Sequence, residues 1–461
     1  MSREIQYGEV ASPKSDCTYK PVMLSDETMK QRYQKVVDKM RDENIDTLVI
    51  YGDVEHGNNF EYLTGFVPRF EEALLILHKD GSSYMVMGNE NLNKVQHARI
   101  QAKAIHAPYF SLPNQPMGNP DDFITILKSA GIKENQRIGL VGWKNFTSIH
   151  EDNTLLFDMP SYIVDTVKHI KGAQGSVVNA TSLFIGEHGV RCVNNVNELE
   201  HYEFGASLAS DCMLKAMDRL DIGVSEMTLG SCLLSHGQTP SVVTIASAGK
   251  RFVKANLYPT DRKVALQDPI SLTVGYKGGL SSRSGYAVYE ESELSKEQQD
   301  YLNAVVKPYY SAVVAWLEQV HCGMTGNDVY EIVNKVLPKA EYHWTLCPGH
   351  LTADEEWLSS PIYEKSEEGI VSGMLFQIDI IPSVQGYAGT SAECTVAIAD
   401  EQLREDIKTQ APDLWNRIRK RRDYIINELH IKLHPDILPM GSTVGYLRPF
   451  LLNKKKAMYV K

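Results

Sequence analysis

Apolar and polar positions alternate in two distinct periods over roughly the first 175 residues. Met29, Val36 and Met40 recur at helical spacing behind Ser25, a residue type that caps helix N-termini, so this stretch predicts an amphipathic helix. Short apolar runs predict buried strands, and a further amphipathic segment predicts a second helix; the strands are at 47–51, 73–77, 84–87 and 138–141, and the helix is at 120–130. Strands that alternate with helices indicate an α/β layer.

The second half of the chain begins with a long helical pattern from about residue 197 that stops before Gly223. Strand-like stretches follow at 242–248 and 270–274. A second long helix is predicted from Ser295, a plausible N-cap, to about residue 320, and it ends before Gly323. Each long helix closes at a glycine and precedes a short helix, which hints at an internal duplication.

The C-terminal segment has a charged helical pattern over residues 401–429 and then a proline-broken tail. We expect residues 434–452 to wrap around the surface of the protein or of a partner subunit. The basic stretch Lys454–Lys456 is short and is interpreted as a solvated tail.

Length and composition predict a soluble protein of two domains. A chain of 461 residues exceeds one ordinary core, and the pattern places an N-terminal domain at 1–180 and a second domain at 190–400, which 401–461 extend. Apolar residues make up 43% and charged residues 23%, and the apolar runs are shorter than a membrane span. The first 13 residues lack an apolar core of signal-peptide type, so we expect a cytoplasmic location and no membrane association.

The net charge argues against one class of binding partner, and the cysteine content indicates the redox state of the thiols. A net charge of -11 argues against nucleic acid, which normally requires a basic face. The seven cysteines are an odd number without a CxxC pair, a pattern typical of reduced thiols.

One histidine and two carboxylates lie in apolar, strand-like surroundings near the end of the second domain. His350 follows Pro348–Gly349, Asp379 ends GMLFQID, and Glu393 lies in SAECTVAIA. An unpaired buried charge costs several kcal/mol, so these acids require a partner, which is a metal ion, a proton or a cationic substrate.

The order of these segments resembles the creatinase, prolidase and methionine aminopeptidase superfamily. The stretch NNFEYLTGFVPRFEEALLIL at 58–77 is similar to the YLTGF region of creatinases and of aminopeptidases that act before proline. The resemblance implies an α/β protein with a creatinase-type N-terminal domain followed by a pita-bread catalytic domain. It also implies a homodimer.

When the metal-ligand pattern of the superfamily is laid on this chain without gaps, only His350 and Glu393 of the five ligand positions are unchanged. The two aspartate positions are Thr273 and Ser284, and the three later ligand positions are His350, Asp379 and Glu393. A substrate-contacting histidine falls on Asn256, and a second histidine falls on Trp357.

These replacements argue against a two-metal centre. Two divalent cations require several carboxylates, and neutral hydroxyls at 273 and 284 do not supply the charge. We therefore expect no metal cofactor. The alternative is a single Zn or Mn ion held by His350, Asp379 and Glu393, although Asp379 is one methylene shorter than the glutamate of the superfamily.

A metal-free site has a precedent in creatinase, whose architecture this chain resembles. In this interpretation His350 is the base, and Asp379 or Glu393 orients it or binds a substrate cation. Asn256 and Trp357 are candidate substrate contacts. Arg283 either binds a substrate carboxylate or neutralises the two leftover acids, and we favour the second role. Glu355 and Glu356 are expected to face solvent.

The sequence thus predicts a hydrolase of a C–N bond, amide or amidino, in a small molecule or short peptide, without a two-metal centre. Two alternatives remain open. One is a non-catalytic peptidase homologue that binds a peptide or small molecule, and the other is an aminopeptidase or dipeptidase with a single metal ion.

Overall fold

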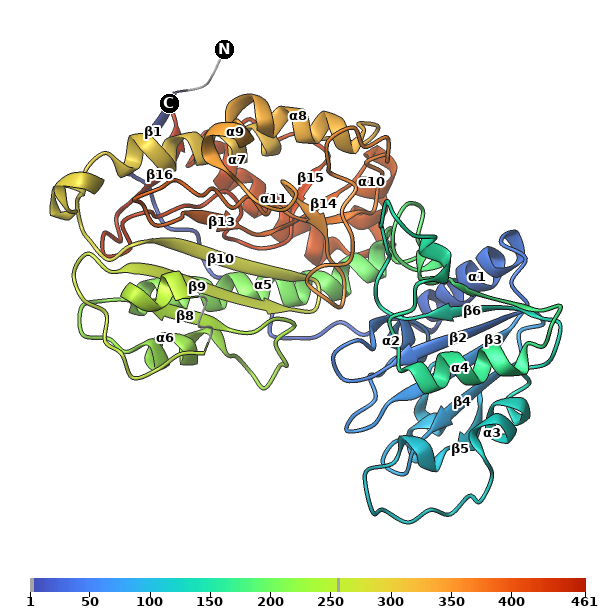
Figure 1. Cartoon of the computed structure of the whole chain (residues 1–461). Coiled ribbons are helices and arrows are strands. Elements are labelled where there is room, and N and C mark those ends of the chain that lie inside the picture. The colour runs from blue at the N-terminus through green and yellow to red at the C-terminus, as the bar shows by residue number, and fades with distance from the viewer. Residues whose placement is uncertain (1–3, 255–257) are drawn as a thin grey trace. The chain divides into compact units, whose positions relative to one another are not determined.

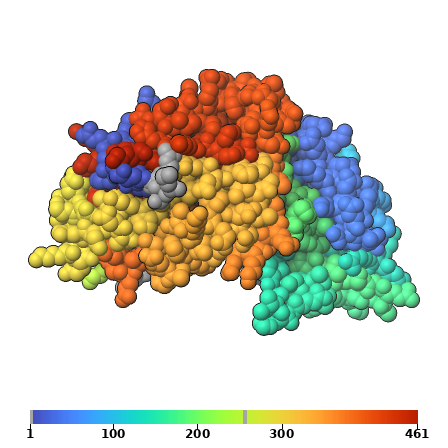
Figure 2. Space-filling model, turned by 90° about the horizontal axis from the view of Figure 1, so that it is seen from above, coloured from blue at the N-terminus to red at the C-terminus, as the bar shows by residue number. Residues whose placement is uncertain are grey.

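The computed structural model describes residues 4–254 and 258–461 and divides into two compact units. One unit is Leu24–Cys192, and the other combines Met1–Met23 with Val193–Lys461. The sequence interpretation placed residues 1–23 with the N-terminal domain. They belong with the C-terminal unit because β1 (Ile5–Glu9) pairs antiparallel with β16 (Lys456–Val460). Figure 2 shows this contact as blue N-terminal atoms beside dark red C-terminal atoms.

The unit Leu24–Cys192 is built on a six-stranded sheet of mixed direction, as the alternating pattern predicts. Its strand order is β5-β4-β3-β2-β6-β7, and the strands are β2 (Thr47–Gly52), β3 (Ala73–His78), β4 (Ser83–Met87), β5 (Lys103–His106), β6 (Arg137–Val141) and β7 (Ser176–Asn179). Helices α3 (Phe123–Ser129) and α4 (Ser161–Ile170) pack on one face, where Ile126 and Val167 join Val49 in the core. The remaining helices are α1 (Asp26–Asp42), which Ser25 caps as predicted, and α2 (Asn58–Thr64).

The larger unit contains two four-stranded sheets (Figure 1). The first has the order β13-β10-β9-β8, with β8 (Ile245–Ala248), β9 (Pro269–Tyr276), β10 (Gly279–Tyr286) and β13 (Ser391–Glu393). The second has the order β11-β12-β14-β15, with β11 (His350–Leu351), β12 (Leu375–Gln377), β14 (Thr395–Ile398) and β15 (Ile437–Pro439).

The helices of this unit repeat one arrangement. Helix α5 (Val196–Arg219) is followed by α6 (Glu226–Leu233), and α7 (Lys307–Gln319) by α8 (Gly326–Val336). Between the members of each pair lies a glycine whose N–H donates to a distant strand-like segment, Gly223 to the Val264 carbonyl and Gly323 to the Ile370 carbonyl. The repeat supports the internal duplication that the sequence suggested.

The predicted helix over residues 295–320 is interrupted in the structure. A 3₁₀ turn at Lys296–Gln298 and a π-helical turn at Leu302–Val306 precede α7, and Ser295 makes no side-chain cap bond. Pro308 explains the change of period, because proline has no N–H to continue the helical ladder and its ring crowds the preceding turn. Short helix α9 (Lys339–Tyr342) follows α8, and the predicted helix at 401–429 is broken at Pro412 into α10 (Glu401–Gln410) and α11 (Pro412–Asn427).

The C-terminal tail is part of the core, which corrects the expectation of a surface wrap. Val444, Leu447 and Phe450 are fully buried, and β15 extends the second sheet. Lys456 likewise begins strand β16 and is not part of a solvated tail. Among the described residues, none of the helices has the length and apolar character needed to cross a bilayer.

Candidate active site

A polar row crosses the first sheet. Strands β9 and β10 form a hairpin whose turn includes Gly278 at φ +95°, and in this register Thr273 lies opposite Ser282, which in turn lies opposite Glu393 of β13. Thr273 Oγ1 and Ser282 Oγ are 2.9 Å apart and hydrogen bonded. Because side chains alternate along a strand, Ser284 lies on the same face. These four residues line a pocket of about 1030 Å³.

The second sheet brings His350 next to acids that line this pocket, although the buried imidazole is not itself a lining residue. His350 in β11 pairs with Gln377 of β12, and Asp379 follows two residues after β12 ends. His350 Nε2 lies 3.9 Å from Asp379 Oδ2, and the imidazole is fully buried. Asp379 and Glu393 are also buried and both line the pocket. The structure therefore brings together the histidine and both acids that the sequence singled out.

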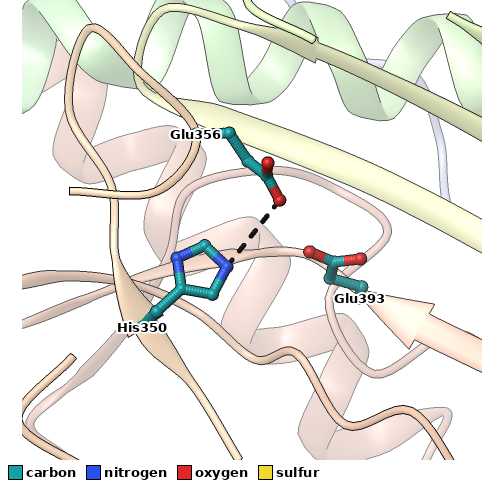
Figure 3. Close-up of side chains that lie close together, drawn as sticks. All are labelled: His350, Glu356 and Glu393. Carbon is teal, nitrogen blue, oxygen red and sulfur yellow. Dashed lines mark ion pairs between the residues drawn. The ribbon is translucent and has the colours of Figure 1, made fainter. Parts of the chain in front are cut away.

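A third carboxylate joins this group from a residue that the sequence interpretation placed in solvent. Glu356 Oε1 lies 3.8 Å from His350 Nε2, and potential ligand atoms of His350, Glu356 and Glu393 all lie within 4.8 Å of one another. Figure 3 shows the three side chains pointing toward one another. We call Glu356, Asp379 and Glu393 the acid cluster.

The position of Glu356 follows from a chain reversal. Leu351 and Ser359 pair as an isolated bridge, with hydrogen bonds from the Leu351 and Leu358 N–H groups closing a loop over residues 352–358. This loop returns Glu356 to the histidine that precedes it. The adjacent apolar and aromatic residues were the only sequence signal that this segment turns inward.

The structure does not place Trp357 or Asn256, two residues predicted to contact a substrate, in the lining of the pocket. The Trp357 ring stacks on the His350 ring, with centroids 4.1 Å apart and planes inclined by 22°, and it is not one of the residues that line the pocket. Trp357 therefore covers His350. Asn256 lies outside the described residues.

Arg283 does not line the pocket, and its guanidinium makes hydrogen bonds to main-chain carbonyls and none to the acid carboxylates. Its side chain is fully buried and donates to four main-chain carbonyls, those of Ser282, Glu393, Thr443 and Tyr446. Strand alternation is the reason, since Arg283 lies between Ser282 and Ser284 and so projects from the opposite face of β10. Arg283 is therefore not placed to bind a ligand carboxylate in the pocket, whereas its charge lowers the pKa of Glu393 against the larger effect of burial, in the direction of the neutralising role that we favoured.

Within the pocket, the acid cluster has no cationic side chain beside it among the described lining residues. The described residues that line the pocket include no lysine or arginine. Burial, and to a lesser extent the charge of Glu356, raises the pKa of Asp379 to about 7. Burial, followed by the charges of Asp379 and Glu356, raises the pKa of Glu393 well above its usual range.

His350 presents a lone pair to these acids. Burial lowers its pKa to about 4, so the ring is neutral at pH 7. His350 Nδ1 lies 3.2 Å from the Leu351 carbonyl oxygen, an acceptor, which assigns the proton to Nδ1. Nε2 is therefore an acceptor, and within the described structure neither it nor Glu393 Oε1 has a hydrogen-bond partner.

The residues do not fit two metal ions. Thr273 and Ser284 supply hydroxyls, and the Thr273 hydroxyl is paired with that of Ser282. One cation fits the donor set better, because an imidazole lone pair and nearby carboxylates converge on one point with two buried acceptor atoms unused.

Comparison with known proteins identifies the architecture. Residues 32–153 match the model of the Creatinase/Prolidase N-terminal domain. The structure is similar to a recombinant prolidase from Thermococcus sibiricus (TM-score 0.62, 17% identity, covering 81% of this chain and 95% of that chain). It is also similar to an Xaa-Pro dipeptidase from Bacillus anthracis (TM-score 0.59, 14% identity, covering 81% of this chain and 96% of that chain). The chain has the creatinase/prolidase fold.

This creatinase/prolidase fold confirms the predicted order of a creatinase-type N-terminal domain and a pita-bread domain. A similar structure is the dipeptidase PepE from Mycobacterium ulcerans (TM-score 0.61, 16% identity, covering 81% of this chain and 94% of that chain). No curated protein matches the sequence.

Proposed function

We propose that this chain is a peptidase-type hydrolase that cleaves a C–N bond in a small or short-peptide substrate without a two-metal centre. The observation that carries the proposal is the buried His350, whose unpartnered Nε2 faces the acid cluster at the side of a large pocket in a prolidase-like fold. Such a histidine is placed to accept a proton, and the nearby carboxylates are placed to stabilise the imidazolium that results.

The proposed reaction adds water across the C–N bond. His350 Nε2 takes a proton from a water molecule as its oxygen bonds to the substrate carbon. A protonated carboxyl group of the acid cluster, from Asp379 or Glu393, gives its proton to the nitrogen as the C–N bond breaks. The imidazolium then returns its proton to that carboxylate, so that the site is restored.

The test is turnover by chelator-treated protein on a panel of peptide, amide and amidino substrates, compared with the variant His350→Gln. We expect the substitution to reduce kcat by about 100-fold or more, because general-base catalysis contributes on this order. His321→Gln is the matched control, since His321 stacks on His434 and lines a different groove of the same unit. Equal turnover by His350→Gln would contradict the proposed base, and no turnover across the panel would favour a non-catalytic binding protein.

A second candidate is a hydrolase with one metal ion. It is favoured by the two unused buried acceptors, His350 Nε2 and Glu393 Oε1, and by the third carboxylate from Glu356. These residues and Asp379 would hold the ion, which when bound supplies Lewis-acid activation of water. Dialysis against Zn²⁺ or Mn²⁺ followed by elemental analysis tests it. Retention of about one ion per chain, lost in Glu393→Gln, would support this candidate, whereas retention of none would exclude it.

A further inference from the structure

The pocket has an uneven distribution of polar and apolar groups. The acid cluster contributes three carboxyl groups at one part of its wall. Elsewhere the lining includes Val243, Leu346 and Ile381, which are 41%, 54% and 45% exposed. Leu346 and Ile381 lie near each other, because Thr345 and Ile381 pair as a bridge, and exposed apolar side chains in a pocket indicate contact with an apolar ligand or partner surface.

The charges of the lining are equally one-sided. In the part of the chain that the structure describes, acids are the only ionisable side chains of the lining besides tyrosine, and Arg283 lies behind the sheet. A ligand carboxylate at the acid cluster would meet like charges, with no lysine or arginine among the described lining residues to pair with it. A ligand ammonium would meet opposite charges.

The buried acceptors also match an ammonium group in number. Atoms of His350, Glu356 and Glu393 lie within 4.8 Å of one another, and two of the three residues have an unused buried acceptor. A primary ammonium offers three N–H donors from a single nitrogen. One such group would satisfy the atoms that the protein leaves unpaired, and an apolar body attached to it would reach the exposed apolar wall.

We infer that the pocket binds an apolar primary amine that has no carboxylate close to the amine, such as the N-terminal residue of an amidated peptide, in preference to a zwitterionic amino acid or free dipeptide. The amine lies at His350, Glu356 and Glu393, and the apolar group lies toward Leu346 and Ile381. The inference deepens the proposed function by naming its substrate class, but binding of the ligand does not require turnover.

The experiment is calorimetric titration of chelator-treated full-length protein at pH 7 with three ligands of one shape. Phenylalanine amide carries the cation alone, phenylalanine is the zwitterion, and N-acetylphenylalanine amide is neutral. We expect phenylalanine amide to bind at least tenfold more tightly than the other two. This comparison uses the unmodified protein, so it does not depend on whether a variant folds.

Variants then locate the site. Glu393→Gln is expected to weaken binding of phenylalanine amide by tenfold or more, whereas Glu331→Gln, on the exposed side of α8 away from the pocket, leaves it unchanged. Equal or tighter binding of phenylalanine would overturn the inference. Binding that appears only after addition of Zn²⁺ or Mn²⁺ would also overturn it, because a metal ion would then occupy the cluster.

The failure of this inference differs from failure of the proposed function. If phenylalanine amide and its peptide derivatives bind selectively but are not hydrolysed, the ligand class stands and the hydrolase proposal fails. If free dipeptides bind more tightly and are hydrolysed, the hydrolase proposal stands and the ligand class is wrong.

Discussion

Replacement of Asp379 by asparagine should stabilise the ligand-free protein at and above neutral pH. Asp379 is 5% exposed, and its carboxyl lies beside two other acids. Burial raises its pKa from 3.8 to about 7, so the folded protein resists ionisation of this group more than the unfolded chain does. A carboxyl with a raised folded pKa favours the folded state below the unfolded pKa, and that contribution is lost as pH rises through the folded pKa.

The size of the effect follows from these two values. The difference between 3.8 and about 7 corresponds to about 4 kcal/mol of lost stability once pH exceeds 7. Between pH 5 and pH 8 the same two values give a loss of about 3 kcal/mol. Asparagine does not ionise, so Asp379→Asn should lack this contribution to the pH dependence.

Urea unfolding of both proteins at intervals from pH 5 to pH 8, in the presence of a chelator, measures the difference. Asp328→Asn is the control, because hydrogen bonds from Thr325 at the start of α8 lower the pKa of Asp328 from its usual 3.8. The contribution of Asp328 to stability is therefore constant from pH 5 to pH 8 and is lost only at lower pH. If the unmodified protein and Asp379→Asn keep the same stability difference from pH 5 to pH 8, the Asp379 carboxylate has a compensating partner and the reasoning fails.

Two further predictions test the framework behind the pocket. Arg283→Met leaves four main-chain carbonyls without their buried hydrogen-bond donor and should lower the free energy of unfolding by about 3–5 kcal/mol. The control Arg419→Met replaces an exposed arginine and should change the free energy of unfolding little. Equal urea midpoints for the two variants would contradict a stabilising role of the Arg283 hydrogen bonds. Gly278→Ala places a Cβ 2.3 Å from the Tyr202 carbonyl oxygen, whereas the control Gly386→Ala has a similar positive φ and no atom within 4 Å of the added Cβ. Differential scanning calorimetry should therefore show a clearly lower Tm for Gly278→Ala than for Gly386→Ala. Similar Tm values would mean that the β9–β10 turn relaxes without cost.

The secondary structure was largely predictable because its signals are local. Ser25 caps α1 as its position indicates, and the apolar run from Thr47 forms β2. The interruption at Pro308 was missed because the flanking apolar residues continue at helical spacing, while the missing N–H acts only at one point of the ladder.

The C-terminal tail shows where local pattern stops being informative. Tyr446 and Thr443 lie in a proline-broken, turn-like stretch that resembles a surface loop in composition. They are buried because their carbonyls accept hydrogen bonds from Arg283, a residue about 160 positions earlier. Only the tertiary pairing of these segments supplies a donor inside the core, so the sequence alone favoured a surface position.

The sequence predicted three of the four residues of the candidate site. His350, Asp379 and Glu393 follow from the motif order, and the structure brings them together. Glu356 was missed because gap-free spacing assigned the neighbouring position, Trp357, to the pocket. Adjacent side chains in a tight loop point in different directions. An alignment that is wrong by one residue therefore assigns the Trp357 ring, which covers His350, to the position that the Glu356 carboxylate occupies.

The presence of Glu356 in the acid cluster changes the interpretation of Thr273 and Ser284, which replace two acidic ligands of the superfamily. Thr273 and Ser284 carry no charge, and the Thr273 hydroxyl is hydrogen bonded to that of Ser282. Negative charge is therefore confined to the half around His350, where three carboxyl groups and two unused acceptors converge without a protein cation among the described lining residues. Burial of such a group is costly unless a cation or protons accompany it. A pocket with one charged half and an exposed apolar wall fits a single organic cation better than two metal ions, and this asymmetry distinguishes it from a two-metal hydrolase site.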